Sequence, residues 1–289
     1  MIDFIAKPLG SILFGIYELL PFSSYGLAIV IFTIIVKLLL LPLTVKQVKS
    51  SSKMTELRPK MQEIQKRYKN DKEKLNQEML KFYQENKFNP MSGCLPMFLQ
   101  FPILIALITV LGKPLTYVFS MQSEAKMLIN EIGLNVKDNY AELKVIGSFT
   151  KEIGEKIFST TPQVVDKFLE LKSSIVFLGL NLGAIPSYKP AILFGPDSTQ
   201  YLLLLLIPIL STIATYLSSK MTMPKVSSEG AEVAMQKNMM YMMPVLSLVF
   251  AFNFPAGVGL YWLVSYVFQI VQQMFINKYM TNKKEAVLD

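Results

Sequence analysis

The sequence predicts an all-α polytopic membrane protein. Hydrophobic residues make up 52% of the 289-residue chain and charged residues only 17%, a balance that soluble domains rarely have. Five apolar stretches contain no Asp or Glu and are long enough for membrane helices, at residues 25–45, 95–118, 200–219, 238–254 and 258–277. The segments between them differ in charge, so the same sequence also predicts an orientation.

Loop charge places the N-terminus outside and the C-terminus in the cytoplasm. Residues 46–93 carry twelve Lys or Arg against six acids, whereas residues 119–199 carry eight Lys against nine acids. Basic loops stay on the cytoplasmic side. We therefore expect a 119–199 extracellular region and a short cytoplasmic tail at 278–289.

The first 22 residues form a separate apolar segment, interrupted by Lys7, Pro8 and Glu18. This segment is open to two interpretations, a signal peptide or an uncleaved helix on the outer membrane face. It lacks a basic start and a small-residue cleavage site. These features favour an extracellular-side interfacial helix over residues 1–22.

A cytoplasmic helical hairpin is expected within residues 46–93. Apolar residues recur there at three- and four-residue steps in two stripes, with a break at Asn70–Asp71. The hairpin is either a solvated basic element that fixes topology or a contact surface for lipid headgroups, a nascent chain or a partner. The block 23–118 thus holds two transmembrane helices and the hairpin, and 200–277 holds the last three.

Lys37 lies near the middle of the first predicted span, and none of the five spans contains an acid that could pair with it. A lysine at that depth costs about 2.5–3.5 kcal/mol on insertion scales. Such a charge usually faces water or a partner. It therefore indicates a functional site.

Further polar side chains accompany Lys37. Thr33 precedes it by one helical turn, and Gln100 lies between two prolines of the second span. The fifth span carries a polar face, formed by Trp262, Ser265, Gln269 and Gln272, with Tyr261 beside it. Taken singly, each of these side chains could have a purely structural role, either in a hydrogen bond between helices or as an anchor at the membrane interface. Together with Lys37 they predict a hydrated concavity between helices, with a methionine cluster around Met239–Met243 where the fourth span enters.

Several enzyme classes are excluded. The chain has no histidine and a single cysteine, Cys94, so it has neither a His-based triad nor a His-based metal site. It contains no phosphate loop and no dinucleotide fingerprint. We expect no catalytic residues, no bound metal and no cofactor.

The sequence resembles the YidC/Oxa/Alb membrane-protein insertases in several separate motifs. These are Phe32–Leu38 (FTIIVKL) with Pro42–Thr44, Glu56–Lys60 (ELRPK), Asn89–Pro96 (NPMSGCLP) with Gln100–Pro102, and Phe254–Trp262 (FPAGVGLYW) with Gln272–Gln273. Their order and spacing follow the family's five-helix core. The resemblance covers about residues 20–120 and 195–280.

The resemblance implies five transmembrane helices around a hydrophilic groove that opens to the cytoplasm and the lipid. The family's groove cation, usually arginine, maps to Lys37, its groove threonine to Thr33, and its substrate-contacting aromatic to Trp262 beside Tyr261. Lysine keeps the charge but loses the bidentate fork of arginine. The absence of a large outer β-domain before Tyr25 resembles the Gram-positive form. The tail is short, which argues against the ribosome docking that long basic tails provide in some relatives.

The implied function is insertion of nascent membrane proteins into the bacterial cell membrane, alone or with the Sec translocon. The expected partners are nascent chains, the translocon, the ribosome and the lipid bilayer, with no direct contact to nucleic acid. Two alternatives remain: a solute transporter or channel, and a passive assembly scaffold whose spans pack dry. An intramembrane protease is disfavoured by the lack of histidine.

Overall fold

The computed structural model describes residues 2–20, 23–87, 95–135, 138, 140–196, 198–222 and 231–285. Within residues 95–100, 231–237, 239 and 279–285, only the backbone is described. The described chain is predominantly helical, with one short two-stranded hairpin, so the predicted all-α class is confirmed at this level.

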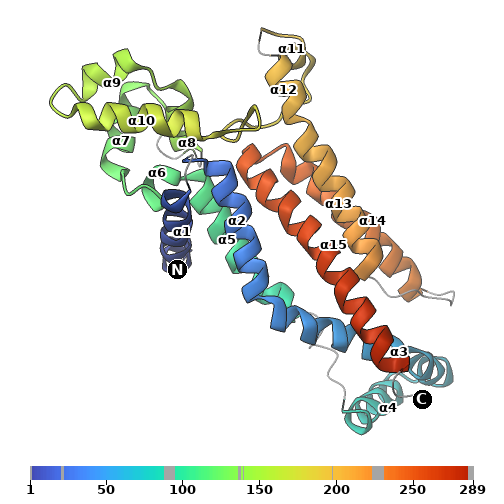
Figure 1. Cartoon of the computed structure of the whole chain (residues 1–289). Helices are drawn as coiled ribbons and strands as arrows, with labels where there is room; N and C mark the ends of the chain where they lie inside the picture. Colours follow the sequence, from blue (N-terminus) through green and yellow to red (C-terminus); the bar gives the residue numbers. More distant parts are fainter. Residues whose placement is uncertain are drawn as a thin grey trace.

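Long helices form a tilted bundle that makes up the body of the molecule (Figure 1). They are α2 (Tyr25–Leu39), α5 (Leu95–Gly112), α13 (Leu206–Thr222), α14 (Ala231–Ala251) and α15 (Ala256–Glu285). Helix α13 packs against α14 and α15, and α15 also contacts α2 and α5. The approach of α13 to α15 depends on Gly259, since a Cβ there would lie 2.6 Å from the Ile207 side chain.

One described helix, Ser198–Thr222, is long and apolar enough to cross a membrane by itself. A second appears when the bent pair Tyr25–Leu39 and Leu41–Arg67 is taken as one span. Phe101–Gly112 and Met240–Ala251 are apolar but shorter. Length and composition of the described helices therefore support one or two of the five predicted spans.

The first predicted span is not one straight helix through residue 45. Helix α2 ends at Leu39, and α3 (Leu41–Arg67) departs from it at an angle of 56°. Pro42 lies in the first turn of α3 and has no N–H to continue the α2 hydrogen-bond ladder. Lys37 consequently lies in the last turn of α2 rather than mid-helix.

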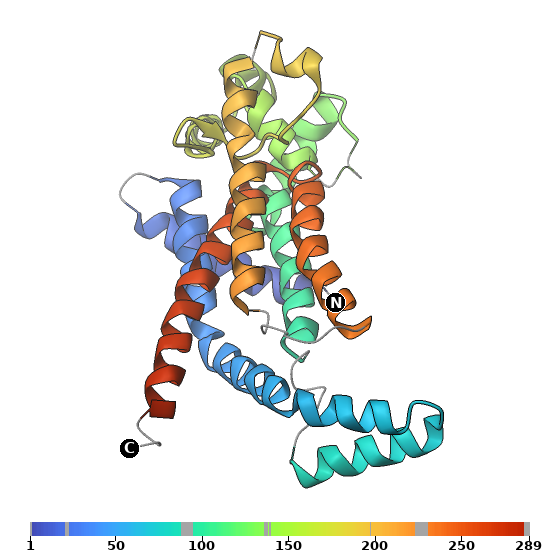
Figure 2. The same cartoon turned by 90° about the vertical axis from the view of Figure 1, so that its right-hand side faces the viewer.

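Helices α3 and α4 (Lys72–Glu85) form a hairpin that stands away from the bundle (Figure 2). The side chain of Asp71 caps α4 by accepting a hydrogen bond from the Lys74 amide. Leu57, Met61 and Phe82 form a small buried cluster between the two helices. This cluster is separate from the main hydrophobic core.

Residues 114–182, named here the upper domain, form a helical unit. The sequence offered no account of residues 119–172 and placed residues 114–118 in the second predicted span, whereas α5 ends at Gly112 and a separate short helix follows it. The elements of the upper domain are α6 (Pro114–Tyr117), α7 (Gln122–Glu131), α8 (Ala141–Ser148), α9 (Lys151–Ile157), α10 (Pro162–Ser174), β1 (Val176–Phe177) and β2 (Leu180–Asn181). The strands pair antiparallel. Phe168 stacks on Phe149 at 4.8 Å and on Phe158 at 6.2 Å, which gives the domain an aromatic centre.

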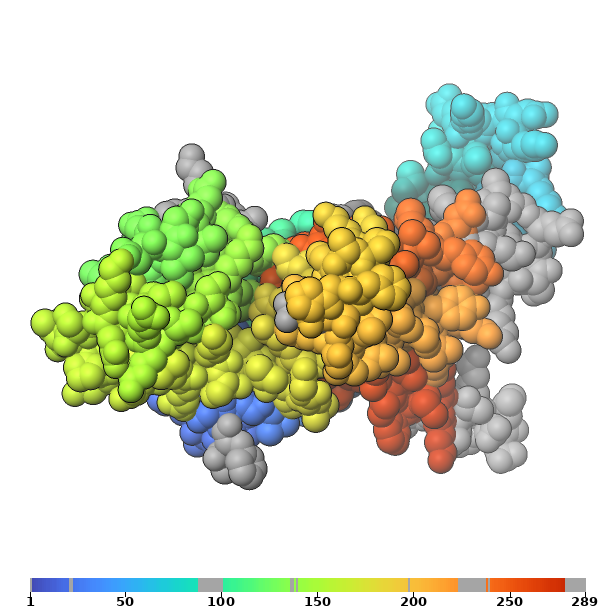
Figure 3. Space-filling view, turned by 90° about the horizontal axis from the view of Figure 1, so that it is seen from above, coloured from blue at the N-terminus to red at the C-terminus, as the bar shows by residue number. Residues whose placement is uncertain are grey.

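The upper domain contacts the bundle at α2 and α15. The β1–β2 hairpin lies against α2, where a Cβ on Gly26 would lie 2.3 Å from the Phe177 ring. The amides of Ala256 and Gly257, at the start of α15, donate 2.8 Å hydrogen bonds to backbone carbonyls of the segment after β2. Helices α11 (Pro190–Leu193) and α12 (Ser198–Leu204) then lead into α13, and Figure 3 shows them beside the upper domain on the same face.

Helix α1 (Ile2–Leu19) runs across the bundle, and Figure 1 shows it nearly end-on where the bundle helices are seen from the side. It packs on α5, α2 and α6. The contact with α6 is close, because a Cβ on Gly10 would lie 2.1 Å from the carbonyl oxygen of Tyr117. The crosswise direction suits the interfacial helix predicted for this segment.

Candidate functional site

A cavity of about 330 Å³ lies between the lower part of α2, the start of α3, α5, α14 and α15. Its described lining consists of Lys37, Leu40, Leu43, Thr44, Gln47, Ile103, Leu104, Met243, Tyr261, Trp262, Ser265, Tyr266, Gln269 and Gln272. We call this space the Lys37 cavity. Its lining is apolar on α5 and polar on α15.

The polar wall of the Lys37 cavity comes from one face of α15. Trp262, Ser265, Gln269 and Gln272 follow one another at three- and four-residue steps, so a continuous helix presents them on the same side. The indole of Trp262 is held by edge contacts with Phe250 at 5.7 Å and by Tyr266 at 6.1 Å. The wall is therefore fixed by regular helix geometry and by aromatic packing.

The opposite wall carries Lys37 at the end of α2. Every buried residue of α2 precedes Lys37, which is itself half-buried. Among the described residues, Lys37 makes no hydrogen bond or ion pair, and none of the described lining side chains is a carboxylate. The carbonyl end of α2 carries partial negative charge and offsets part of the cost of this cation.

Three buried polar atoms of this wall have no hydrogen-bond partner among the described residues. They are Trp262 Nε1, Ser265 Oγ and Gln272 Nε2. A buried donor left unpaired costs about 1–3 kcal/mol, so such atoms in proteins normally bond to water or to a ligand. The Lys37 cavity has the volume and the polar partners that ordered water requires.

The structure brings together most of the predicted site. Lys37, Tyr261, Trp262, Ser265, Gln269 and Gln272 all line the cavity. Thr33 does not: it is fully buried one turn away, and its hydroxyl donates to the Ile29 carbonyl oxygen at 2.6 Å. The side chain of Gln100 lies outside the described residues.

The sequence interpretation missed three lining residues with polar atoms. Thr44 and Gln47 follow Lys37 by seven and ten residues and join its wall across the bend, while Tyr266 lies one turn after Trp262 on α15. Helical spacing alone would have indicated Tyr266. Thr44 and Gln47 required knowledge of the bend, because they belong to a separate helix.

The sequence profile of the family described as "60Kd inner membrane protein" matches residues 16–284, nearly the whole chain. The chain belongs to this family. Together with the names of its bacterial relatives, given next, this match confirms the resemblance to the YidC/Oxa/Alb insertases, and the protein is a bacterial membrane protein.

Relatives of this YidC/Oxa/Alb chain carry matching names. A "Membrane protein insertase YidC" of Oceanobacillus iheyensis is 32% identical over 269 residues, covering 91% of this chain and 78% of the relative. "Membrane protein insertase YidC 2" of Bacillus anthracis is 30% identical, covering 88% and 72%. "Membrane protein insertase YidC 1" of Listeria monocytogenes is 29% identical, covering 91% and 67%. The similarity therefore includes the upper domain as well as the bundle.

Proposed function

We propose that this protein inserts nascent membrane proteins into the bilayer through the Lys37 cavity. Relatives named as membrane protein insertases cover about nine-tenths of the chain. The family comprises insertases and chaperones rather than enzymes, in agreement with the prediction that the chain is not an enzyme. The observation that carries the proposed mechanism is the set of unpartnered polar atoms around the cation Lys37.

In the proposed topology, five helices cross the membrane, the N-terminus and upper domain are outside, and the α3–α4 hairpin and tail are cytoplasmic. The excess of basic residues in 46–93 supports this orientation. The upper domain and the dense core beneath it then close the cavity toward the outside. The bend at Leu40 lets the cavity open toward the hairpin.

The proposed mechanism is electrostatic and needs no cofactor. Water in the cavity thins the hydrocarbon barrier for a short polar segment, and Lys37 attracts its acidic residues through a medium of reduced dielectric. The apolar helix of the substrate moves into lipid along the outer surfaces of α13 and α15, driven by burial worth about 25 cal/mol per Å². The membrane potential adds about 2.3 kcal/mol per charge per 100 mV for acidic segments moving outward.

The decisive experiment reconstitutes the protein alone in liposomes with a small acidic-tailed membrane protein. Lys37→Glu should reduce insertion by about tenfold or more, which is about 1.4 kcal/mol or more, and Lys37→Arg should preserve it. Lys46→Glu makes the same change in net charge at an exposed residue outside the cavity lining and should have little effect. Equal insertion by the two Glu variants would remove Lys37 from the mechanism.

The same liposomes separate the two alternatives. A solute transporter would pass small solutes without any substrate protein. A passive scaffold would leave a membrane-impermeant thiol reagent unreactive with Lys37→Cys, tested in a Cys94→Ser background so that position 37 carries the one thiol. Cooperation with the Sec translocon and docking of the ribosome are part of the proposal. Adding each component to the reconstituted protein and measuring the insertion rate tests them separately.

A further inference from the structure

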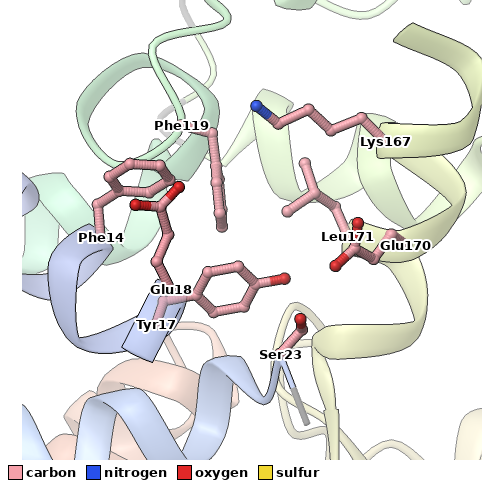
Figure 4. A pocket seen from close by; sticks show the side chains of 8 residues that line it. All are labelled: Phe14, Tyr17, Glu18, Ser23, Phe119, Lys167, Glu170 and Leu171. Carbon is pink, nitrogen blue, oxygen red and sulfur yellow. The ribbon is translucent and has the colours of Figure 1, made fainter. Parts of the chain in front are cut away.

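A second pocket, of about 460 Å³, lies far from the Lys37 cavity, between α1, α10 and the segment after α6. Its lining residues are Phe14, Tyr17, Glu18, Ser23, Phe119, Lys167, Glu170 and Leu171 (Figure 4). None of them lines the Lys37 cavity. The insertion mechanism above does not use this pocket.

The pocket has an aromatic interior and a charged rim. Tyr17, Phe119 and Leu171 are buried, while Glu18, Lys167 and Glu170 are exposed. Phe119 packs edge-on against Tyr17 at 5.2 Å, and Phe14 packs edge-on against Phe119 at 6.1 Å. Two carboxylates and one amine give the rim a net charge of −1, and aromatic faces attract cations as well.

The buried polar atom aimed into this pocket is the hydroxyl of Tyr17. Tyr17 is 6% exposed, and its Oη atom has no hydrogen-bond partner of normal geometry among the described residues. Figure 4 shows the hydroxyl pointing between Ser23 and Glu170, with Lys167 extending over the opposite side. Burial raises the pKa of Tyr17 above its ordinary value. Hydrogen-bonding contacts with the Ser174 and Ser23 side chains, too poor in geometry to count as full hydrogen bonds, lower this pKa, and the charge of Glu170 raises it, so the net shift is upward. The hydroxyl therefore remains a neutral donor.

The three charged side chains of the rim are also available for a ligand. Within the described residues, the side chains of Glu18, Lys167 and Glu170 form no ion pair and no hydrogen bond with another side chain. A single charged side chain without a partner is common on protein surfaces. Here they surround one hollow together with a buried hydroxyl that makes no hydrogen bond of normal geometry among the described residues, which is the arrangement of a site for a ligand carrying both charges.

The exposed apolar face of α1 indicates that the molecules nearest to this pocket are membrane lipids. Phe4 and Leu19 are 85% exposed, Ile12 is 47% and Ile2 is 46% exposed, and at 100° per residue these side chains lie within an arc of about 160° on the helix. Glu18 lies outside this arc, on the polar side of the same helix. An interfacial helix with such faces rests its apolar side in the acyl chains and its polar side among the headgroups. The pocket mouth then lies at headgroup level.

We infer that this pocket binds the headgroup of a phospholipid with a primary ammonium, such as phosphatidylethanolamine, in the outer leaflet. The ammonium donates hydrogen bonds to the carboxylates of Glu18 and Glu170 and lies against the aromatic rings. The phosphate accepts from Lys167 and from the hydroxyls of Tyr17 and Ser23. The acyl chains run beside Leu19. This inference uses the membrane location of α1 and is independent of the insertion activity.

The test measures lipid binding to the purified full-length protein by native mass spectrometry. The probes are phosphatidylethanolamine, phosphatidylglycerol and phosphatidylcholine of the same chain length. Phosphatidylethanolamine should bind at least about tenfold more tightly than phosphatidylglycerol. Glu170→Gln should remove most of this preference, because its carboxylate holds the ammonium that phosphatidylglycerol lacks. Lys167→Gln and Tyr17→Phe should weaken the binding of all three lipids, because these side chains hold the phosphate that the lipids share.

Glu152→Gln and Lys126→Gln are matched controls at exposed residues of the upper domain outside the pocket, and they should bind like the unchanged protein. Equal or tighter binding of phosphatidylglycerol, or equal losses in the controls, would overturn the assignment. In a competition experiment, soluble phosphoethanolamine is added to the lipid-bound protein. If it displaced the lipid completely at comparable concentration, the pocket would be a site for a free phosphoamine and the lipid assignment would be wrong. Thermal unfolding of each variant verifies that it is folded.

Discussion

Glu142 of α8 accepts two hydrogen bonds from Thr116 of α6, one from the backbone amide at 3.0 Å and one from the hydroxyl at 2.5 Å. The two residues are 26 positions apart in sequence, and Glu142 is 6% exposed. This pair joins the helices that form the base of the upper domain. A buried carboxylate held only by neutral donors should make the stability of this region depend on pH.

The sign of that dependence follows from the pKa of Glu142. Burial raises this pKa above the ordinary carboxyl range, and the hydrogen bonds from Thr116 and the charge of Lys113 offset burial only in part. The folded protein therefore keeps a proton that the unfolded chain has already released. Stability should fall as pH rises from the ordinary carboxyl range through the raised folded value.

Glu142→Gln should flatten this decline, because the amide accepts from Thr116 without titrating. The measurement is the unfolding midpoint in detergent between about pH 4 and pH 8. Glu152→Gln, at an exposed residue, should leave the slope unchanged. A slope that stays the same in the Glu142 variant would mean that another group titrates.

Gly10→Ala should destabilise the protein by about 1–3 kcal/mol, because the added Cβ meets the backbone oxygen of Tyr117 at 2.1 Å and backbone cannot rotate away. Gly15→Ala is the matched control in the same helix. Nothing lies within 4 Å of its Cβ, so it should be neutral or stabilise by about 0.5–1 kcal/mol. Unfolding midpoints of the two variants give the comparison, and equal effects would contradict the close packing of α1 on α6.

Filling the polar wall of the Lys37 cavity with apolar side chains should raise stability and lower activity. Ser265→Ala and Gln272→Leu each remove a buried polar atom that has no partner among the described residues. Each should therefore be neutral or stabilising by about 1 kcal/mol. If water in the cavity is required, insertion by the double variant should fall well below that of the unchanged protein.

Gln273→Leu is the control for this pair. Gln273 is also buried on α15, but it donates to Asn277 Oδ1 at 2.8 Å and does not line the cavity. It should lose about 1 kcal/mol of stability and retain insertion. Full insertion by the Ser265/Gln272 double variant would show that hydration of the wall is dispensable.

Phe82→Ala should open the α3–α4 hairpin without unfolding the bundle. Phe82 is one of three buried residues in a cluster separate from the main core, so its loss should cost the hairpin about 3 kcal/mol. Hydrogen exchange should accelerate in α4 and remain unchanged in α13. Leu80→Ala, at a residue 60% exposed on the same helix, should alter neither.

The sequence predicted the polar wall of α15 well because helical spacing is a local property. Thr33 was placed in the site by the same spacing, yet its hydroxyl bonds to the carbonyl one turn back, as Thr in helices often does. The upper domain could not be foreseen. Its α6–α10 helices are short and depend on tertiary contacts such as the stacking of Phe149 on Phe168, which link distant parts of the chain.

The joint at Leu40 connects two parts of the molecule that otherwise touch little. Helix α2 belongs to the main core, whereas α3 belongs to a hairpin with its own small core. A single residue separates the turn that carries Lys37 from the first turn of α3. A change in the angle between the α3–α4 hairpin and the bundle would therefore move the C-terminal end of α2, which carries the amine of Lys37.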